Sequence, residues 1–134
     1  MPFPVEEVYI QNAESELGVR FPDSFRKKMQ EANGGRVDVG EDDFELHPFY
    51  DSSNRKRITR TCNSIVHETK KEREGGWQLP DDLIVIGNNG SGDRLVFQVE
   101  PNGCIDPSVY WFDHETRELK LAAKDFNDLP ETTW

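Results

Sequence analysis

The sequence lacks the features that mark membrane proteins, disulfide-rich secreted proteins and zinc proteins. No uninterrupted apolar segment approaches the ~20 residues that a membrane-spanning helix needs, and no basic segment with a following apolar run begins the chain. The two cysteines, Cys62 and Cys104, are too few for a disulfide scaffold and do not have the spacing of zinc ligands. We therefore expect a cytoplasmic protein with free thiols, without a membrane partner and without a bound metal.

Positive charge is also scarce. Lysine and arginine total 16 against 26 aspartates and glutamates, which gives a formal net charge of -10. A chain of this charge repels nucleic acid and attracts basic partners. The basic residues concentrate in residues 55–73, whereas five acids crowd residues 38–45 with no lysine or arginine among them. These acids are Asp38, Glu41, Asp42, Asp43 and Glu45.

The length of 134 residues predicts one domain, residues 1–134, with one substantial core. Helical spacing predicts a first helix that begins near Pro4 and ends at Gly18, and a second that begins after Phe21 and stops at residues 33–35. A third helix is predicted over residues 54–74, and the helical phase makes Cys62 a buried, inert thiol. The buried positions expected on this third helix are Ile58, Cys62, Ile65 and Thr69.

Alternating apolar residues predict strands in the rest of the chain. Residues 37–39 and 44–46 form an expected antiparallel pair around the acidic bend, and residues 83–86, 95–99, 109–112 and 119–121 form an expected meander. A short helical piece around residues 122–126 would close the domain. Helices first and a meander later predict an α+β fold with a central, mainly antiparallel sheet flanked by helices.

The glycine-rich segment 87–93 is the strongest candidate for a ligand loop. Its Gly90-Ser91-Gly92 resembles a dinucleotide fingerprint, but the third glycine is missing and a strand follows in place of a phosphate-binding helix. We therefore interpret the segment as a structural turn in which Asp93 hydrogen-bonds the turn amides. The residues assigned to this turn are Gly87, Asn89, Gly90, Gly92 and Asp93.

No residue pattern identifies a catalytic centre or a cofactor site. His47, His67 and His114 share no metal-ligand spacing, so surface or sheet-edge positions are expected for them. No serine stands in the G-x-S-x-G pattern of a nucleophile elbow. The sequence thus predicts no enzyme, no catalytic residue and no cofactor.

Two charged segments are candidates for partner binding. The acidic segment does not have the offsets of an EF-hand loop, so it is either a solvated loop or a docking patch for a basic protein, with Trp77 as a candidate aromatic anchor. The basic segment 55–73 could contact RNA, but its own glutamates and the overall charge favour a solvated helix face with internal ion pairs.

An ordered set of short motifs across nearly the whole chain resembles the Smi/Knr branch of the SUKH superfamily. The matching residues are Glu16-Leu17-Gly18, Phe21-Pro22, Phe25, Asn33-Gly34-Gly35, Phe44, Leu46, Leu79-Pro80, Ile86-Gly87, Asn89-Gly90 and Gly92-Asp93. The resemblance implies an α+β fold without enzyme activity. It also implies a protein partner, because bacterial members look like immunity proteins that neutralise a polymorphic toxin, often a nuclease.

Three functions stay open from the sequence. The first is an immunity protein that binds a basic toxin domain directly, as a monomer or weak homodimer. The second is a regulatory scaffold, because fungal members of the superfamily resemble scaffolds in cell-wall signalling. The third is a hydrolase that uses clustered carboxylates and a divalent cation, for which no motif with the right offsets is present.

Overall fold

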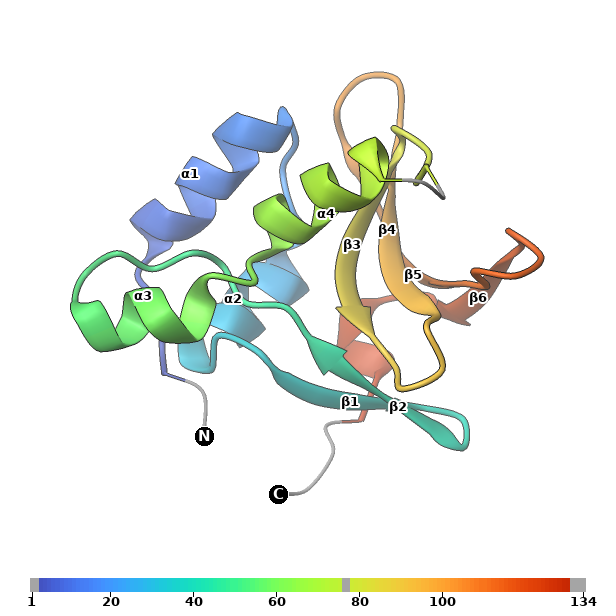
Figure 1. The fold of residues 1–134 in the computed structure, drawn as a ribbon, viewed down its shortest axis with the longest axis horizontal. Coiled ribbons are helices and arrows are strands. Elements are labelled where there is room, and N and C mark those ends of the chain that lie inside the picture. The colour runs from blue at the N-terminus through green and yellow to red at the C-terminus, as the bar shows by residue number, and fades with distance from the viewer. Residues whose placement is uncertain (1–2, 76–77, 131–134) are drawn as a thin grey trace.

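The computed structural model describes residues 3–75 and 78–130, which form one α+β domain (Figure 1). Two helices, a strand pair, two more helices and a four-stranded meander follow one another along the chain. The elements are α1 (Glu7–Leu17), α2 (Asp23–Glu31), β1 (Gly35–Val39), β2 (Asp42–Leu46), α3 (Arg55–Thr61), α4 (Ile65–Glu74), β3 (Leu83–Asn88), β4 (Arg94–Val99), β5 (Ile105–Phe112), β6 (Leu119–Ala123) and the 3-10 turn η1 (Phe126–Asp128). The predicted fold class is confirmed.

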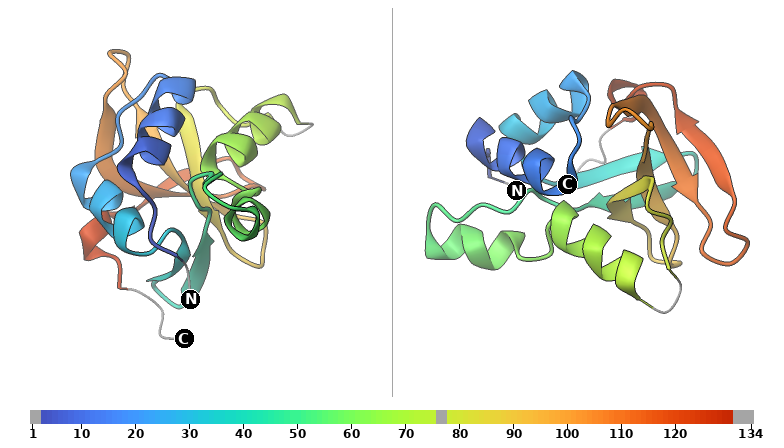
Figure 2. Two further views of the ribbon diagram at one scale, coloured as in Figure 1. Left: turned by 90° about the vertical axis from the view of Figure 1, so that its left-hand side faces the viewer. Right: turned by 90° about the horizontal axis from the view of Figure 1, so that it is seen from above.

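The six strands form one antiparallel sheet whose order, β1 to β6, follows the sequence. Figure 2 shows that the sheet curls, with α1 and α2 inside the curl. β2 meets β3 only where Glu45 and Leu46 pair with Asn88 and Gly87. Helix α4 covers the rest of that edge of β3. The Val85 amide of β3 donates a hydrogen bond to Thr69 Oγ1 of α4 at 3.1 Å. The β1–β2 pair is therefore a hairpin held to the sheet by its base.

The core lies between the helices and the inner face of the sheet, and Phe25 of α2 is at its centre. Its ring contacts four other phenylalanine rings at centroid distances of 5.6 Å for Phe21, 5.8 Å for Phe49, 5.2 Å for Phe97 and 4.9 Å for Phe126. Three of these contacts are edge-on, the geometry that aromatic pairs prefer. One residue thus joins α2 to β4, η1 and the segment before α3.

The first two helices agree with the sequence prediction. Gly18 ends α1 with a φ of +69°, a left-handed conformation that glycine adopts without strain. A buried ion pair then fixes the two helices together, with Arg26 Nε 3.2 Å from Glu14 Oε2. The same carboxylate oxygen accepts the Phe21 amide at 2.8 Å, so the charges are paired and hydrogen-bonded, as buried charges must be.

The prediction of one helix over residues 54–74 is wrong, because the chain turns between α3 and α4. Ser64 is buried and its hydroxyl accepts the His67 amide at 3.2 Å, so it caps a new helix instead of continuing the old one. Ile65 and Thr69 are buried as expected, but Cys62 is exposed and Ile58 is 38% exposed. The prediction of a buried Cys62 thiol is therefore also wrong.

The predicted strands are present, and the helical piece near the C-terminus lies further along the chain than expected. Ala122 and Ala123 belong to β6, where Ala123 pairs with Val109. The helical turn comes after them because the Asp125 carboxylate caps η1 by accepting the Asn127 amide at 2.9 Å. Within residues 3–75 and 78–130, no helix has the length and apolar character to cross a membrane.

Candidate functional site

The β1–β2 hairpin carries all five acidic residues that the sequence singled out. Its register pairs Asp38 with Asp43 and Arg36 with Glu45, so these four side chains share one face. Val37 and Phe44 point to the other face and are fully buried. The alternation of the strands thus sets one face of the hairpin into the core and leaves the charged face outside.

We call the five acidic side chains of this hairpin the acidic hairpin surface: Asp38, Glu41, Asp42, Asp43 and Glu45. Asp38, Asp43 and Glu45 lie on the charged face and Glu41 lies in the turn, whereas Asp42, opposite Val39, lies on the face of Phe44 at the exposed tip. Asp38 is half-buried and the other four are exposed. The hairpin also carries one cation, Arg36, whose Nη1 lies 3.4 Å from Asp43 Oδ2, and both side chains are about half exposed. An ion pair of this exposure contributes little to stability, so the surface keeps its strong negative charge. Trp77, the proposed aromatic anchor, lies outside the described residues.

Like charges face one another on this surface. Asp38 and Asp43 are directly opposite across the strands, an arrangement that is unfavourable for folding. The pair contributes nothing to the core, which the hairpin reaches through Val37 and Phe44. Figure 1 shows the hairpin extending away from α3 and past the end of β3, where a partner can approach it.

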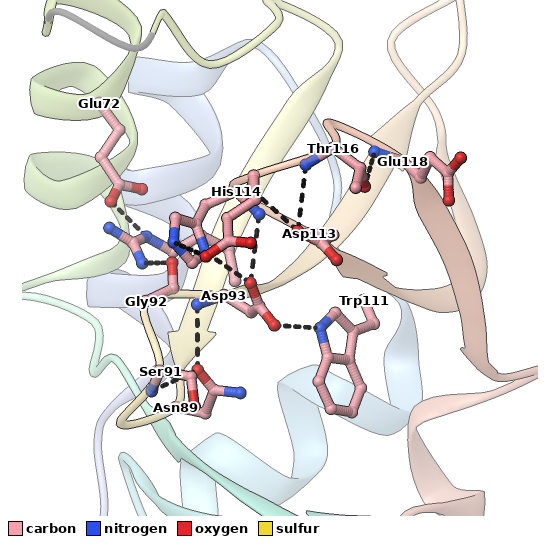
Figure 3. A network of polar contacts seen from close by, with 12 residues as sticks. Glu72, Asn89, Ser91, Gly92, Asp93, Trp111, Asp113, His114, Thr116 and Glu118 are labelled. Atoms are coloured by element: carbon pink, nitrogen blue, oxygen red, sulfur yellow. Dashed lines mark hydrogen bonds and ion pairs between the residues drawn. The ribbon is translucent and has the colours of Figure 1, made fainter.

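The glycine-rich segment is the turn between β3 and β4, and Asn89 organises it. The Asn89 side-chain oxygen accepts the amides of Ser91 and Asp93, both at 3.0 Å (Figure 3). This is the role that the sequence analysis assigned to Asp93, so that assignment is wrong. Gly92 has a φ of +94°, and Gly90 faces open space.

Asp93 instead links β4 to β5 and the turn that follows it. Its carboxylate accepts the indole N–H of Trp111 at 2.9 Å and the backbone amide of His114 at 3.2 Å, and it lies 2.7 Å from His114 Nδ1 (Figure 3). Burial raises the pKa of Asp93, but the hydrogen bonds from His114 and Trp111 outweigh burial and hold this pKa below its usual value. The sequence could not reveal this contact, because about twenty residues separate Asp93 from His114.

The same corner contains a group that could offer ligands to a cation. Oxygen and nitrogen atoms of Asp93, Asp113 and His114 lie within 4.8 Å of one another. Hydrogen bonds within the protein already engage them, since Asp113 Oδ1 accepts the amides of Glu115 at 2.8 Å and Thr116 at 3.2 Å. These hydrogen bonds and those of Asp93 indicate that the three side chains stabilise the turn between β5 and β6.

Gly87 lies within β3 and not in the turn to which it was assigned. A Cβ atom at this position would lie 2.7 Å from the carbonyl oxygen of Glu45, closer than real Cβ atoms come to any neighbour. Glycine is therefore required here because the backbone of β2 passes so close. The residue positions the acidic hairpin surface without taking part in it.

His47 is buried, so the expectation of a surface or edge position is wrong for it. It follows β2 directly, and its amide donates to Ile86 O at 2.8 Å, which holds it under α4. Burial lowers the pKa of His47. Burial also raises the pKa of the neighbouring Glu72, although Arg94 pairs with this carboxylate. The two shifts reflect packing under α4 rather than a reactive site.

A groove that the sequence did not indicate lies between α1 and α4. It has a volume of about 700 Å³, and its lining includes Tyr9, Tyr50, Cys62, Val66 and His67. Residues 9–16, 49–52 and 62–70 line this groove. Because these segments are distant from one another in the sequence, no local sequence pattern predicts the groove.

The comparison with known families rests on nearly the whole chain. The SMI1/KNR4 family (SUKH-1) matches residues 4–131. The chain belongs to this family. Membership confirms the resemblance seen in the motifs and fits both an immunity protein and a Smi/Knr-type scaffold, two roles that involve a protein partner. A search of curated proteins found no match to the chain.

The SUKH motifs have structural roles in this chain. Asn33 holds the segment before α3, because its side chain donates to Phe49 O at 2.9 Å and accepts the Phe49 amide at 2.8 Å. Gly34 and Gly35 follow with φ values of +128° and +100°. Phe21 and Phe25 fill the core. These motif residues specify the SUKH fold, whereas the acidic hairpin surface lies almost entirely outside them.

Proposed function

We propose that this SUKH-family protein is a non-catalytic binding module of the immunity type, which neutralises a polymorphic toxin by direct binding. The proposed contact is the acidic hairpin surface, and the proposed partner is a basic toxin domain. The observation that carries the proposal is that one projecting hairpin gathers five carboxylates, four of them exposed, around one arginine.

Electrostatics makes such a surface suited to a basic partner. Complementary charge steers diffusing proteins together and raises the association rate, and like charges elsewhere suppress wrong partners. Four of the five carboxylates are exposed, so the cationic side chains of a partner can reach them directly. The buried Val37 and Phe44 hold the hairpin to the core while its carboxylates face solvent.

Neutralisation of this kind needs no catalytic group. Among the described residues, the close pairs of titratable side chains link elements of the fold. Asp93 contacts His114 in the β5–β6 turn, and Glu72 of α4 pairs with Arg94 of β4. Blocking an essential surface of the toxin is sufficient for inhibition, so binding affinity and association rate are the relevant quantities.

The test uses the toxin domain encoded beside this gene, purified and titrated with the protein while the toxin's activity is measured. We expect activity to fall to zero at an equimolar ratio. A variant with Glu41→Gln, Asp42→Asn and Asp43→Asn should require a clear excess to reach the same inhibition. A matched control, Glu74→Gln with Glu100→Gln and Glu115→Gln, removes the same charge from exposed positions elsewhere and should inhibit like the wild type.

Two results would contradict the proposal. A toxin that stays fully active and unbound in an equimolar mixture would exclude this toxin as the partner and, with it, the immunity function. A stable complex that leaves the toxin active would instead favour the Smi/Knr-type scaffold function, in which recognition occurs without inhibition.

A further inference from the structure

We propose that Trp111 of β5 fixes the orientation of the acidic hairpin surface, and that Asp93 holds the Trp111 ring in place for this purpose. Both are positioning residues, because neither belongs to the acidic hairpin surface and each acts on it through another side chain. The inference rests on the proposed function for its effect on toxin binding. The effect on the hairpin itself can be measured without a toxin.

Strand pairing with the rest of the sheet fixes only the base of the β1–β2 hairpin. Of the two residue pairs that join β2 to β3, the pair of Glu45 and Asn88 lies nearer the tip. β1 and β2 stay paired with each other beyond this point, as far as Val39 and Asp42. Four of the five residues of the acidic hairpin surface lie in this distal part. Contacts other than strand pairing with β3 must therefore set its orientation.

The distal part of the hairpin packs through Phe44 against β5. The Phe44 and Trp111 rings are edge-on, with their centroids 5.0 Å apart and an angle of 85° between their planes. Phe44 is fully buried, and Trp111 is half-buried and packs against the core. The curl of the sheet brings β2 to β5 although the two strands are not neighbours in the sheet. Edge-on packing is a preferred geometry of aromatic pairs, so it favours one placement of β2 over β5.

A hydrogen bond at the start of β4 fixes the Trp111 ring. Trp111 Nε1 donates to Asp93 Oδ2 at 2.9 Å (Figure 3). The other carboxylate oxygen, Asp93 Oδ1, accepts the His114 amide at 3.2 Å and lies 2.7 Å from His114 Nδ1. Both oxygens of this carboxylate are engaged, and its side chain is only 14% exposed. Asp93 is thus a fixed acceptor, which gives the indole ring one preferred orientation.

The other contacts of the distal hairpin are made by β1. The Asp38 amide donates to Pro130 O at 2.8 Å, and Val37 is buried in the core. Phe44 belongs to β2, the strand that carries Asp42 and Asp43. Loosening Trp111 would therefore allow β2 and its carboxylates to take several orientations. A surface with several orientations binds more weakly, because the partner must order it on binding.

The distance between two spin labels measures the orientation of the hairpin without a toxin. In a background of Cys62→Ser and Cys104→Ser, Glu41→Cys in the hairpin turn and Lys27→Cys on α2 provide exposed labelling positions. Double electron–electron resonance should give one narrow distance distribution for this chain. Trp111→Phe should broaden the distribution at least about twofold, because phenylalanine lacks the indole N–H and the larger ring.

Tyr110→Phe is the matched control for this measurement. Tyr110 precedes Trp111 on β5, and its hydroxyl likewise donates to a carboxylate, Asp106 Oδ2, at 3.1 Å. Successive strand residues point to opposite faces, so Tyr110 lies on the face of the sheet away from Phe44. The control should keep the narrow distribution. Equal distributions for Trp111→Phe and Tyr110→Phe would overturn the proposal.

Two variants of Asp93 separate its effect on the hairpin from its effect on stability. Asp93→Ala should broaden the distribution as Trp111→Phe does, because the indole N–H loses its acceptor. Asp93→Asn should keep the distribution narrow, since the amide oxygen can accept the indole N–H although the charge beside His114 is lost. A general loss of stability would instead broaden the distribution in both variants. Equal broadening by Asp93→Ala and Asp93→Asn would contradict the role assigned to Asp93.

The kinetics of toxin binding test the functional consequence. Trp111→Phe retains all five carboxylates, so its association rate should keep the salt dependence of the wild type. Its complex should dissociate at least about fivefold faster, because the hairpin is no longer held in one orientation before binding. Dissociation at the wild-type rate would overturn the link to binding. If the wild-type protein binds no toxin, the proposed function fails, and the spin-label distances still decide whether Trp111 positions the hairpin.

Discussion

At the scale of single residues, the position of the acidic hairpin surface depends on one missing methyl group. Gly87 lets the Glu45 carbonyl approach β3, and this approach forms one of the two residue pairs that join β2 to β3. The sequence analysis assigned Gly87 to a turn, whereas the residue lies within β3. The reason for the glycine is an approach between strands that are distant in sequence, which no local pattern reports.

Gly87→Ala should therefore destabilise the protein by about 1–3 kcal/mol, because the added Cβ overlaps the backbone of β2 and forces the strands apart. Urea denaturation measures this difference. Gly90→Ala is the matched control, since its Cβ would meet nothing within 4 Å, and it should stay within about 0.5 kcal/mol of the wild type. Equal stability of the two variants would contradict the close approach.

Asp93 should make stability depend on pH in the acid range. Because hydrogen bonds from His114 and Trp111 hold its pKa below that of the unfolded chain, its contribution is present above about pH 4 and is lost as pH falls through the folded pKa. Asp93→Asn should be less stable than the wild type at pH 7, and the difference should shrink towards pH 3. The measurement is urea denaturation across this range.

Asp81→Asn is the control for this experiment, because Asp81 is exposed and lies before β3, outside the β3–β4 and β5–β6 turns. At pH 7 this variant should lose less stability than Asp93→Asn, because it removes no contact between β4 and the β5–β6 turn. A difference between Asp93→Asn and the wild type that is the same at pH 3 and pH 7 would contradict the shifted pKa.

At the scale of elements, strand alternation was a better guide than helical spacing. The strands were predictable because burial on one face requires apolar residues at every second position, as in Val37 and Val39. The periodicity of Ile58, Cys62 and Ile65 predicted one helix, yet residues 62–64 break it. Ser64 could either continue one helix or cap a second one, and tertiary packing determines which of the two occurs.

Ser64→Ala tests the role of that serine. It removes the hydroxyl that accepts the His67 amide, and loss of such a cap should cost about 1 kcal/mol of folding free energy. Asn54→Ala removes the equivalent cap of α3, but α3 buries only Thr61, so we expect a smaller effect on global unfolding. Thermal or urea denaturation would contradict this account if Asn54→Ala were the more damaging change.

At the scale of the whole molecule, charge is separated in space as well as in sequence. Lys56, Arg57 and Arg60 of α3 gather around the ring of Phe3, with the two guanidinium carbons 4.9 Å and 4.8 Å from its centre. Figures 1 and 2 place α3 at the far side of the domain from the tip of the β1–β2 hairpin. The protein therefore presents a basic helix and an acidic hairpin in different directions.

This separation limits what sequence could predict of the candidate site. The acidic segment was evident from composition, but whether it formed a solvated loop or a shaped surface depended on the register that pairs Asp38 with Asp43. The basic segment was expected to form internal ion pairs, but Lys70 pairs with Glu16 of α1 at 3.5 Å, and the cations of α3 gather around Phe3. Long-range packing decided both outcomes.

The central claim is that the acidic hairpin surface drives association with a basic toxin domain. The most direct measurement is the association rate of the two purified proteins, followed by stopped flow at increasing salt. For the wild type and for the Glu74, Glu100 and Glu115 control, the rate should fall steeply as salt screens the attraction. The variant with neutral residues at 41–43 should associate more slowly and depend less on salt. Association of this variant at the wild-type rate, with the wild-type salt dependence, would contradict the account.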